Sequence, residues 1–332
     1  MFFSDKTASI TRLLFFLCLL FLCCLASLIF GTKQVSYQTV FSSFTAYTGS
    51  EDHVIIQTVR LPRTMIALAV GAALGVSGAI MQSITRNPLA SPELLGLNSG
   101  AALGVVCSLL FFQNSSISYI WFAFAGATII VTLVFALGSI GRAGLSPIKL
   151  TLAGATITAL SVSFTQGFLI LDERSLDEMR FWLAGSISGR SMEQLYEVLP
   201  FILSGLLLSF LLARHIATLS LGEEVAAGLG QKTGWIKGLS LLTVVLLAGS
   251  SVTIAGPIGF IGLAVPHLIK PFTGFHYKTL LIYSGIVGAI LLVAADITSR
   301  FILYPQDVSV GIMTAILGGP FLIYLVRKKE WK

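Results

Sequence analysis

The sequence predicts an all-helical protein that crosses a membrane about ten times and keeps both termini in the cytoplasm. Hydrophobic residues fill 55% of the 332 positions and charged residues only 11%, whereas soluble domains carry about 25% charged residues. Mean hydropathy is +0.90. Most apolar stretches approach the roughly 20 residues that one helical span requires. These values exclude a soluble enzyme, a disordered chain and a disulfide scaffold.

The elements follow from the apolar stretches, taken in chain order. Because the linkers between them are short, we expect a single transmembrane domain over residues 1–332. The net charge of +6 indicates a basic cytoplasmic face in a membrane protein. The predicted spans lie at about 13–30, 64–84, 94–112, 119–140, 150–171, 195–213, 235–255, 257–269, 279–297 and 310–326.

The first and eighth stretches differ from the others. The first follows Lys6 and Arg12, but it is too long for a signal peptide and is predicted to be an uncleaved span. The eighth is broken by glycine and proline between Gly256 and His267. Such backbone is tolerated at membrane depth where protein covers it or where it lines a cavity, which favours a transport pathway or a hinge. We expect His267 to be hydrogen-bonded at a helix end; a ligand or proton carrier is the alternative.

Small residues and cysteines both indicate packing. Glycines recur every three or four residues in the second and third stretches, at Gly71, Gly75 and Gly78 and at Gly96, Gly100 and Gly104. This pattern predicts closely packed helices. The four cysteines lie in apolar runs, so we interpret them as buried apolar side chains rather than disulfide partners or metal ligands.

Arginines on the external side need an explanation. With the N-terminus inside, about two thirds of the 21 Lys and Arg residues are cytoplasmic. Arg60 and Arg63 nevertheless lie at the outer start of the second span, and Arg300 follows Asp296 at the outer end of the ninth. Arginine binds carboxylates in a forked geometry, so these side chains could grip an acidic partner. Spacing alone favours anchoring at lipid headgroups, together with a local Asp296–Arg300 ion pair.

A cytoplasmic turn precedes the third span. Ser91 is predicted to cap that helix, with Pro92 as its first residue and Glu93 complementing the helix dipole. Asn87 and Leu89 on this elbow could narrow the inner end of a pathway. An ordinary turn is the alternative.

A second cytoplasmic segment carries the capping-box pattern S-x-x-E at Ser220 and Glu223. It predicts a short helix over about 221–228. Apolar side chains recur along it at Leu221, Val225 and Leu229. This stripe suits docking into the groove of a partner, or packing on the protein itself.

Motifs for chemistry are absent from the sequence. It has no G-x-x-x-x-G-K-[ST] phosphate loop, no H-E-x-x-H and no G-x-S-x-G. We therefore predict no enzymatic activity, cofactor, metal or nucleic-acid partner. A carrier driven by an ion gradient remains an alternative, although it should place more charge at midspan. An intramembrane enzyme built on Asp296 or His267 lacks a second catalytic group.

Four motifs together resemble one family, the FecCD-type permeases of bacterial ABC importers for iron–siderophores, haem and cobalamin. They are R-L-P-R-T, N-P-L-A-S-P-E-L-L-G, G-P-I-G-F-I-G-L-A-V-P-H and A-D-I-T-S-R, and they occur in the family's order over about 55–327. The resemblance implies the type II ABC importer fold of about ten spans in the bacterial cytoplasmic membrane. It also implies a second permease subunit, identical or homologous, that helps to enclose the pathway.

The resemblance further implies partners and their sites. A separate ATPase would dock on the segment near 218–230. An external substrate-binding protein would dock through glutamates that meet Arg60, Arg63 and Arg300. The inner gate would lie at Asn87, Leu89, Ser146 and Pro147.

The substrate is less well specified by the resemblance. The stretch N-P-L-A-S-P-E-L-L-G-L-N-S-G-A-A-L looks closest to ferric-citrate and other ferric-siderophore permeases. We therefore rank a ferric siderophore first, then haem, then cobalamin.

Overall fold

The computed structural model describes residues 2–31, 33–112, 116–141, 146–274, 276–303 and 306–327. Within these ranges the secondary structure is helical, apart from one isolated bridge between Leu303 and Gln306. The α-helices are α1 (Phe2–Ile29), α2 (Tyr37–Thr45), α3 (Glu51–Ile55), α4 (Leu61–Thr85), α5 (Leu97–Phe111), α6 (Ser116–Ser139), α7 (Pro147–Leu171), α8 (Glu173–Leu183), α9 (Met192–Ser220), α10 (Glu223–Gly228), α11 (Thr233–Val244), α12 (Ser250–Ala255), α13 (Ile261–Thr273), α14 (Tyr277–Ile302) and α15 (Val310–Arg327).

Three short segments have irregular helical geometry. Two are π-helical, η1 (Ile56–Arg60) and η3 (Val245–Gly249), and one is a 3₁₀ turn, η2 (Pro92–Leu95). The π-segments lie inside long helices: η1 joins α3 to α4, and η3 joins α11 to α12. The chain therefore builds long spans with local irregularities.

The helices confirm the predicted polytopic class. Among the described residues, seven helical stretches are long and apolar enough to cross a membrane: Ile10–Ile29, Glu51–Thr85, Tyr119–Ser139, Pro147–Leu171, Met192–Ser220, Thr233–Ala255 and Tyr277–Ile302. The shorter apolar helices α5, α13 and α15 coincide with the remaining predicted stretches. The eighth stretch becomes helical only at Ile261, because the chain is irregular from Gly256 to Phe260.

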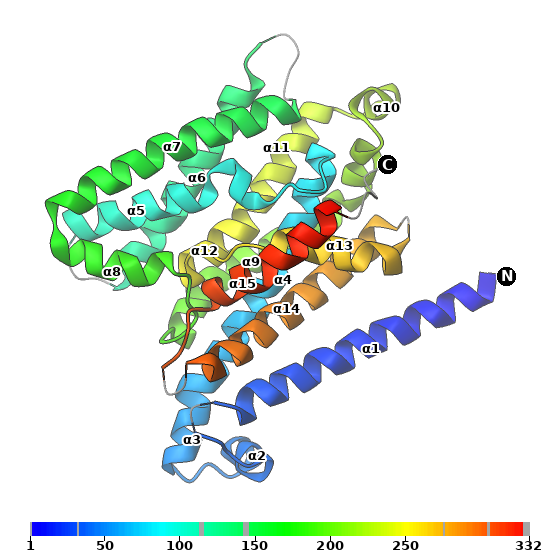
Figure 1. Cartoon of the computed structure of the whole chain (residues 1–332). Helices are drawn as coiled ribbons and strands as arrows, with labels where there is room; N and C mark the ends of the chain where they lie inside the picture. The colour runs from blue at the N-terminus through cyan, green and yellow to red at the C-terminus, as the bar shows by residue number, and fades with distance from the viewer. Residues whose placement is uncertain are drawn as a thin grey trace.

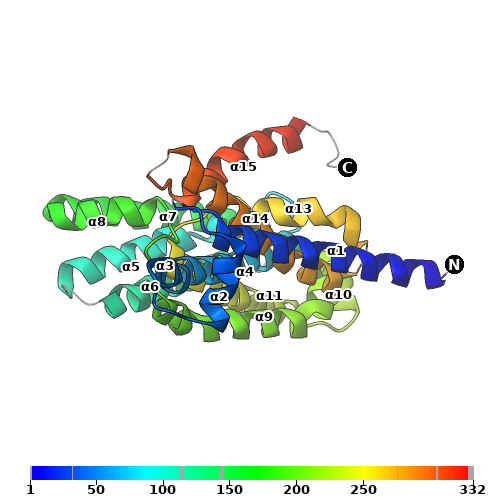
Figure 2. The ribbon, with the colours of Figure 1, turned by 90° about the horizontal axis from the view of Figure 1, so that it is seen from below.

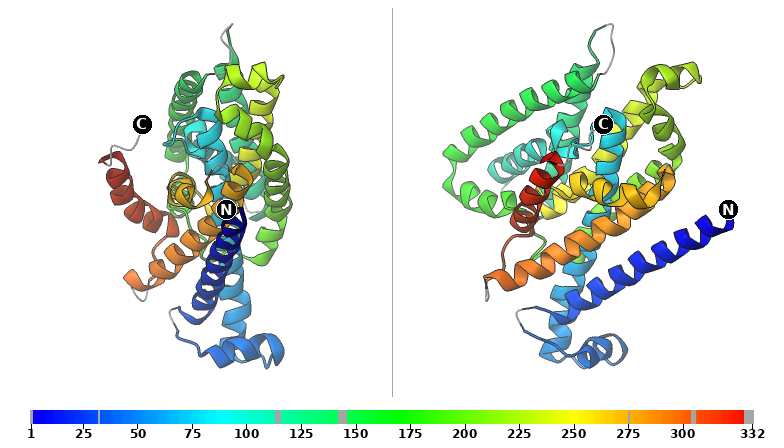
Figure 3. Two further views of the ribbon diagram at one scale, coloured as in Figure 1. Left: turned by 90° about the vertical axis from the view of Figure 1, so that its right-hand side faces the viewer. Right: turned by 45° about the vertical axis from the view of Figure 1, so that its right-hand side comes forward.

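Helix α4 lies at the centre of the molecule (Figure 1). It packs against α9, α13 and α14, and 78% of its most apolar window is buried. Helix α1 lies along α14 at the edge, and only 6% of its window is buried. In Figures 2 and 3, α15 lies on the face of the molecule opposite α9.

Glycines permit the closest helix crossings, as the sequence predicted. On α4, a Cβ at Gly75 would lie 2.2 Å from the carbonyl oxygen of Ser284 on α14. A Cβ at Gly288 on α14 would lie 2.2 Å from the carbonyl oxygen of Gly71. Backbones can approach so closely only where both helices carry small residues. Gly96 differs from the prediction: its φ of 70° ends η2, so it is a turn residue rather than part of a helix face.

Gly75→Ala should destabilise the protein, because the added methyl group meets backbone that cannot rotate away. Overpacking of this kind costs about 1–3 kcal/mol. Gly238→Ala on α11 is the matched control, since its Cβ would meet only the Phe135 ring at 3.7 Å. Thermal unfolding of the purified protein in detergent measures the difference. Equal midpoints for the two variants would contradict the close crossing.

Candidate pathway, coupling and docking sites

The broken segment between α12 and α13 is covered by backbone from two other regions. A Cβ at Gly256 would lie 2.4 Å from the Trp182 carbonyl oxygen, and one at Gly185 would lie 2.3 Å from that of Pro257. The Gly311 N–H at the start of α15 donates to the Gly185 carbonyl at 2.9 Å. Irregular backbone at membrane depth is stable when protein surrounds it in this way.

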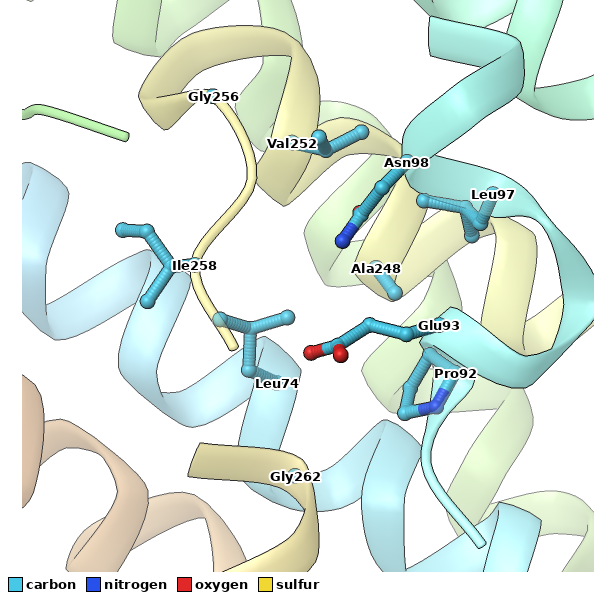
Figure 4. Close-up of a pocket in the computed structure, with 10 residues that line it drawn as sticks. All are labelled: Leu74, Pro92, Glu93, Leu97, Asn98, Ala248, Val252, Gly256, Ile258 and Gly262. Carbon is cyan, nitrogen blue, oxygen red and sulfur yellow. The ribbon is translucent and has the colours of Figure 1, made fainter. Parts of the chain in front are cut away.

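A small pocket lies beside this segment (Figure 4). Leu74, Val252 and Ile258 form apolar parts of its wall. The side chains of Glu93 and Asn98 point into it. The Glu93 carboxylate lies over Gly259, where a Cβ would be 3.2 Å from Oε1, and it accepts a hydrogen bond from the Phe260 backbone N–H. Two polar side chains thus meet the break in the helix.

The predicted helix start at Ser91 is therefore wrong. The Ser91 side chain makes no capping hydrogen bond, and only the 3₁₀ turn η2 follows it. The span begins at Leu97, after Gly96 has turned the chain. Glu93 consequently faces the pocket instead of the helix dipole.

The cytoplasmic elbow between α4 and η2 is a tight turn. Arg86 ends α4 with φ of 49°, in the left-handed region. Asn87 Oδ1 then accepts from the Leu89 N–H at 2.9 Å, which holds the turn. The side chains of Asn87 and Leu89 are exposed.

The second predicted gate segment lies beside this end of α4. Ser146 caps α7 by accepting from the Lys149 N–H at 3.3 Å, with Pro147 in the first turn. Ser146, Pro147 and Thr85 line one small pocket together with the buried Lys237 of α11. The fold thus brings the segments of both predicted gates to the same end of the molecule.

The short cytoplasmic helix α10 exists, but its predicted capping box does not form. Helix α9 continues through Ser220, whose hydroxyl donates to the Ala217 carbonyl at 2.7 Å. Gly222 is the residue before α10 and has φ of 129°. Glu223 forms an ion pair with Lys237 instead of closing a cap. The hydroxyl is satisfied within α9, which is why the box is absent.

The apolar stripe on this segment faces outward. Leu221 is 70% exposed, Val225 49% and Leu229 71%. Packing on the protein itself is therefore wrong for these three side chains. Ala226 is the residue of α10 that is buried.

Arg60 is enclosed by the end of α1. Its guanidinium donates to the carbonyl oxygens of Leu28 and Ile29, both at 2.7 Å, and to that of Lys33. The Lys33 ammonium binds Asp52 at 2.7 Å, and this contact, followed by the one to Glu51, raises the pKa of Lys33. These bonds fix the external loop that follows α1.

Asp296 is the centre of a second buried group. Arg63 Nε donates to Asp296 Oδ1 at 2.8 Å, and Arg63 also binds Asp307. Arg300 binds the other oxygen of Asp296 and donates to the Ser27 carbonyl at 2.7 Å. The predicted Asp296–Arg300 ion pair is confirmed.

The expectation that the three arginines stand at the surface is wrong. Arg60, Arg63 and Arg300 are only 4%, 7% and 3% exposed. Carbonyls and carboxylates of the chain itself surround them, so they do not anchor in lipid headgroups. The charge count compares the two sides of the membrane, so it could not indicate a tertiary partner within the chain.

Comparisons with known proteins place the chain in a family. The model of the FecCD transport family matches residues 19–328. The chain belongs to the FecCD transport family. A siderophore transport system permease of Bacillus subtilis, YfiZ, is 47% identical over 304 residues, or 91% of each chain. The Fe(3+)-citrate import system permease YfmD of the same species is 41% identical over 99% of this chain and 98% of its own.

A solved structure has the same architecture as this FecCD chain. It is a metal-chelate-type ABC transporter in an inward-facing conformation, with a TM-score of 0.84 and 29% identity. The similarity covers 98% of this chain and 99% of the other. The FecCD chain is therefore a multi-pass membrane permease of the ABC importer class.

Two functional candidates in this FecCD chain were missed by sequence reasoning. Glu93 was interpreted as a dipole complement, and Lys237 was not singled out. A lysine inside the apolar run 235–255 was the available signal for Lys237, because a buried charge needs a partner. His267 behaves as expected, with Nδ1 3.1 Å from the Leu263 carbonyl oxygen.

Asp296→Asn should strongly destabilise this FecCD permease, because two buried guanidiniums lose their shared negative charge. Breaking a buried ion pair costs about 3–5 kcal/mol. Asp177→Asn is the control, because its pair with Arg180 is more than 70% exposed on both sides and should contribute about 0–1 kcal/mol. The thermal midpoint in detergent measures both. A stable Asp296→Asn protein would show that the cluster is not needed for folding.

Proposed function

We propose that this chain is the permease subunit of an ATP-driven importer that moves a ferric siderophore across the bacterial cytoplasmic membrane. The observation that carries the proposal is the near full-length similarity to permeases of siderophore and Fe(3+)-citrate systems. The chain would receive the iron complex from an external binding protein. A separate ATPase would supply the energy, and no covalent chemistry would occur on this chain.

The exposed apolar stripe on residues 221–229, the segment that includes α10, supports a role as the ATPase contact. Leu221, Val225 and Leu229 expose apolar surface on the predicted cytoplasmic side. A helix that offers one apolar stripe suits a groove in a partner. Its opposite side is tied to the permease through Glu223 and Lys237.

Contacts between the α10 segment and the rest of the permease connect it to both predicted gate segments. Lys237 binds Glu223 and also lines the pocket that contains Ser146 and Pro147. Arg86, which begins the elbow, lies against Gly222: a Cβ there would be 3.5 Å from Arg86 Nη1. Movement of α10 by an ATPase would therefore reach Asn87 and Leu89 through Arg86, and Ser146 and Pro147 through Lys237.

A second permease subunit would cover α7 and α15. Only 22% of the apolar window of α7 is buried, and its exposed residues include Thr156, Ser163 and Gln166. Helix α15 exposes Ile316 and Leu317. Polar side chains at membrane depth favour a protein or water neighbour over lipid. These faces suit a partner subunit that encloses a pathway.

Docking of the binding protein at the outer ends of α4 and α14 remains a proposal. The buried arginines would act there by holding the external surface in shape, and direct pairing with partner glutamates would require them to leave Asp296 or the α1 carbonyls. Charge reversal at Arg300 would place a carboxylate beside Asp296 and damage the fold. Loss of docking in such a variant therefore needs a folding control.

Val225→Asp should abolish co-purification of the ATPase and ATP-driven uptake, because it places a charge on the docking stripe. Ala227→Asp makes the same change on an exposed position of α10 outside the stripe and should retain both. Uptake of iron-labelled siderophore into proteoliposomes that contain the permease, the ATPase and the binding protein measures the effect. Uptake that survives ATP removal but fails with an uncoupler would support a secondary carrier. Uptake of haem or cobalamin alone would overturn the substrate.

Leu89→Cys should react in a nucleotide-dependent way, because the elbow would change its surroundings as α10 moves. The four native cysteines are first replaced by alanine. Cross-linking to the second subunit, or protection from a cytoplasmic thiol reagent, is compared with and without ATP. A pattern indifferent to nucleotide would remove Leu89 from the gate.

A further inference from the structure

A cavity of about 510 Å³ lies at the external end of the permease. Val105 and Leu109 of α5 and Phe181 of α8 form apolar parts of its wall. Asp307, which precedes α15, also lines it and belongs to the external ion-pair cluster through Arg63. Pockets of about 300–1,000 Å³ typically hold small molecules. The cavity is therefore large enough for a small ligand.

Arg190 is held at the wall of this cavity by Tyr119 of α6. Its Nη1 donates to the Tyr119 hydroxyl at 2.6 Å, and its guanidinium carbon lies 5.7 Å from the centre of the Tyr119 ring. Gln194 Nε2 donates to the same hydroxyl at 2.9 Å, and Gln194 also forms the capping box of α9 with Ser191. The position of Arg190 is thus set by α6 and α9.

Two buried donors of the cavity wall have no partner. Trp182 is only 6% exposed, and its indole Nε1 makes no hydrogen bond. Arg190 Nε is likewise buried without a partner, and no described carboxylate forms an ion pair with Arg190. Buried donors are paired in the great majority of cases. Acceptor atoms inside the cavity would complete both groups.

The donors define the chemistry of the ligand. An indole and a guanidinium can only donate, so the ligand must supply acceptor oxygens. A guanidinium edge matches a carboxylate in a forked geometry. Asp307 is paired with Arg63, and Glu178, the other carboxylate of the wall, is exposed and screened by solvent. Arg190 is therefore available to an incoming carboxylate.

We propose that this cavity is an entry site for ferric siderophores that carry an uncoordinated carboxylate, as ferric citrate complexes can. The inference rests on the proposed function and specifies its substrate class. The carboxylate would accept from Arg190, and another oxygen of the ligand would accept from Trp182 Nε1. Trp182 lies too deep for a protein that only covers the surface, so the occupant is a molecule small enough to enter.

A matched pair of ligands tests the site. One ferric tris-hydroxamate carries an amine that is either acetylated, which leaves no carboxylate, or succinylated, which adds one. Equilibrium dialysis with radioactive iron measures the binding of each to the purified permease in detergent, without the binding protein. A hydrogen bond to a charged group contributes about 1.5–3 kcal/mol, so the succinylated complex should bind about tenfold more tightly. Ferric citrate should compete with it.

Variants of the two donors assign this preference. Arg190→Gln should abolish the advantage of the succinylated complex, and Arg190→Lys should restore it in part, because lysine keeps the charge without the fork. Trp182→Phe keeps an aromatic ring but removes the donor, and it should weaken binding of the succinylated complex about fivefold.

The matched controls are Arg180→Gln on α8 and Trp121→Phe on α6. Arg180 and Trp121 do not line the cavity, and these variants should bind both complexes as the unaltered protein does. The thermal midpoint of each variant shows whether it is folded.

The outcomes separate the two proposals. No binding by the unaltered permease at millimolar ligand, no advantage of the succinylated complex, or an advantage that survives in Arg190→Gln would each overturn the entry site. Loss of binding-protein docking in Arg190→Gln with unchanged ligand binding would assign Arg190 to the partner and overturn it as well. If the reconstituted, unaltered transporter moved no ferric complex, the proposed function would fail, and the dialysis would still report whether the cavity binds a carboxylate.

Discussion

The external end of the molecule depends on one buried carboxylate, Asp296 of α14. A fully buried charge must be paired, and Asp296, with no exposed surface, pairs with both Arg63 and Arg300. Through Arg300 it holds the end of α1, and through Arg63 it holds Asp307 before α15. Four regions that are distant in the sequence are thereby fixed by a single group.

The cytoplasmic end is organised differently, because one lysine contacts both α10 and the predicted gate segment at Ser146 and Pro147. Lys237 is only 4% exposed. It forms an ion pair with Glu223 of α10 and lines the pocket that contains Thr85 of α4 and Pro147 of α7. A rigid cluster such as that around Asp296 suits an end that must keep its shape. The proposed docking segment meets the two turns through a few contacts, at Lys237 and at Arg86 beside Gly222. The two ends are therefore held by different means, a buried ion-pair cluster at one and contacts of Lys237 and Arg86 at the other.

Local patterns in the sequence predicted the spans, the broken eighth stretch and the glycine crossings, because apolar length and small residues act within one helix or one crossing. They failed where two local solutions competed or where the partner was distant. The Ser220 hydroxyl could cap α10 or form a hydrogen bond within α9, and in the structure it donates to the Ala217 carbonyl of α9. Arg63 lies at the start of α4, as the predicted span implied, but its partner Asp296 is 233 residues away. In the sequence, Glu93 stands where an acidic residue would complement the dipole of the next helix. In the structure, the turn at Gly96 separates Glu93 from the start of α5.

Several of the irregular backbone segments lie around Glu93. The pocket that Glu93 faces receives Pro92 from η2, Ala248 from the π-helical η3, and Gly256 and Ile258 from the break between α12 and α13. π-Segments and strained turns persist where function requires them, and Phe260 beside Glu93 has φ of 75°. Regular helices such as α4 and α14 are locked together by glycine contacts and cannot bend without separating. The backbone beside Glu93 already departs from helical bonding, so the structure can bend there with fewer helical hydrogen bonds to break.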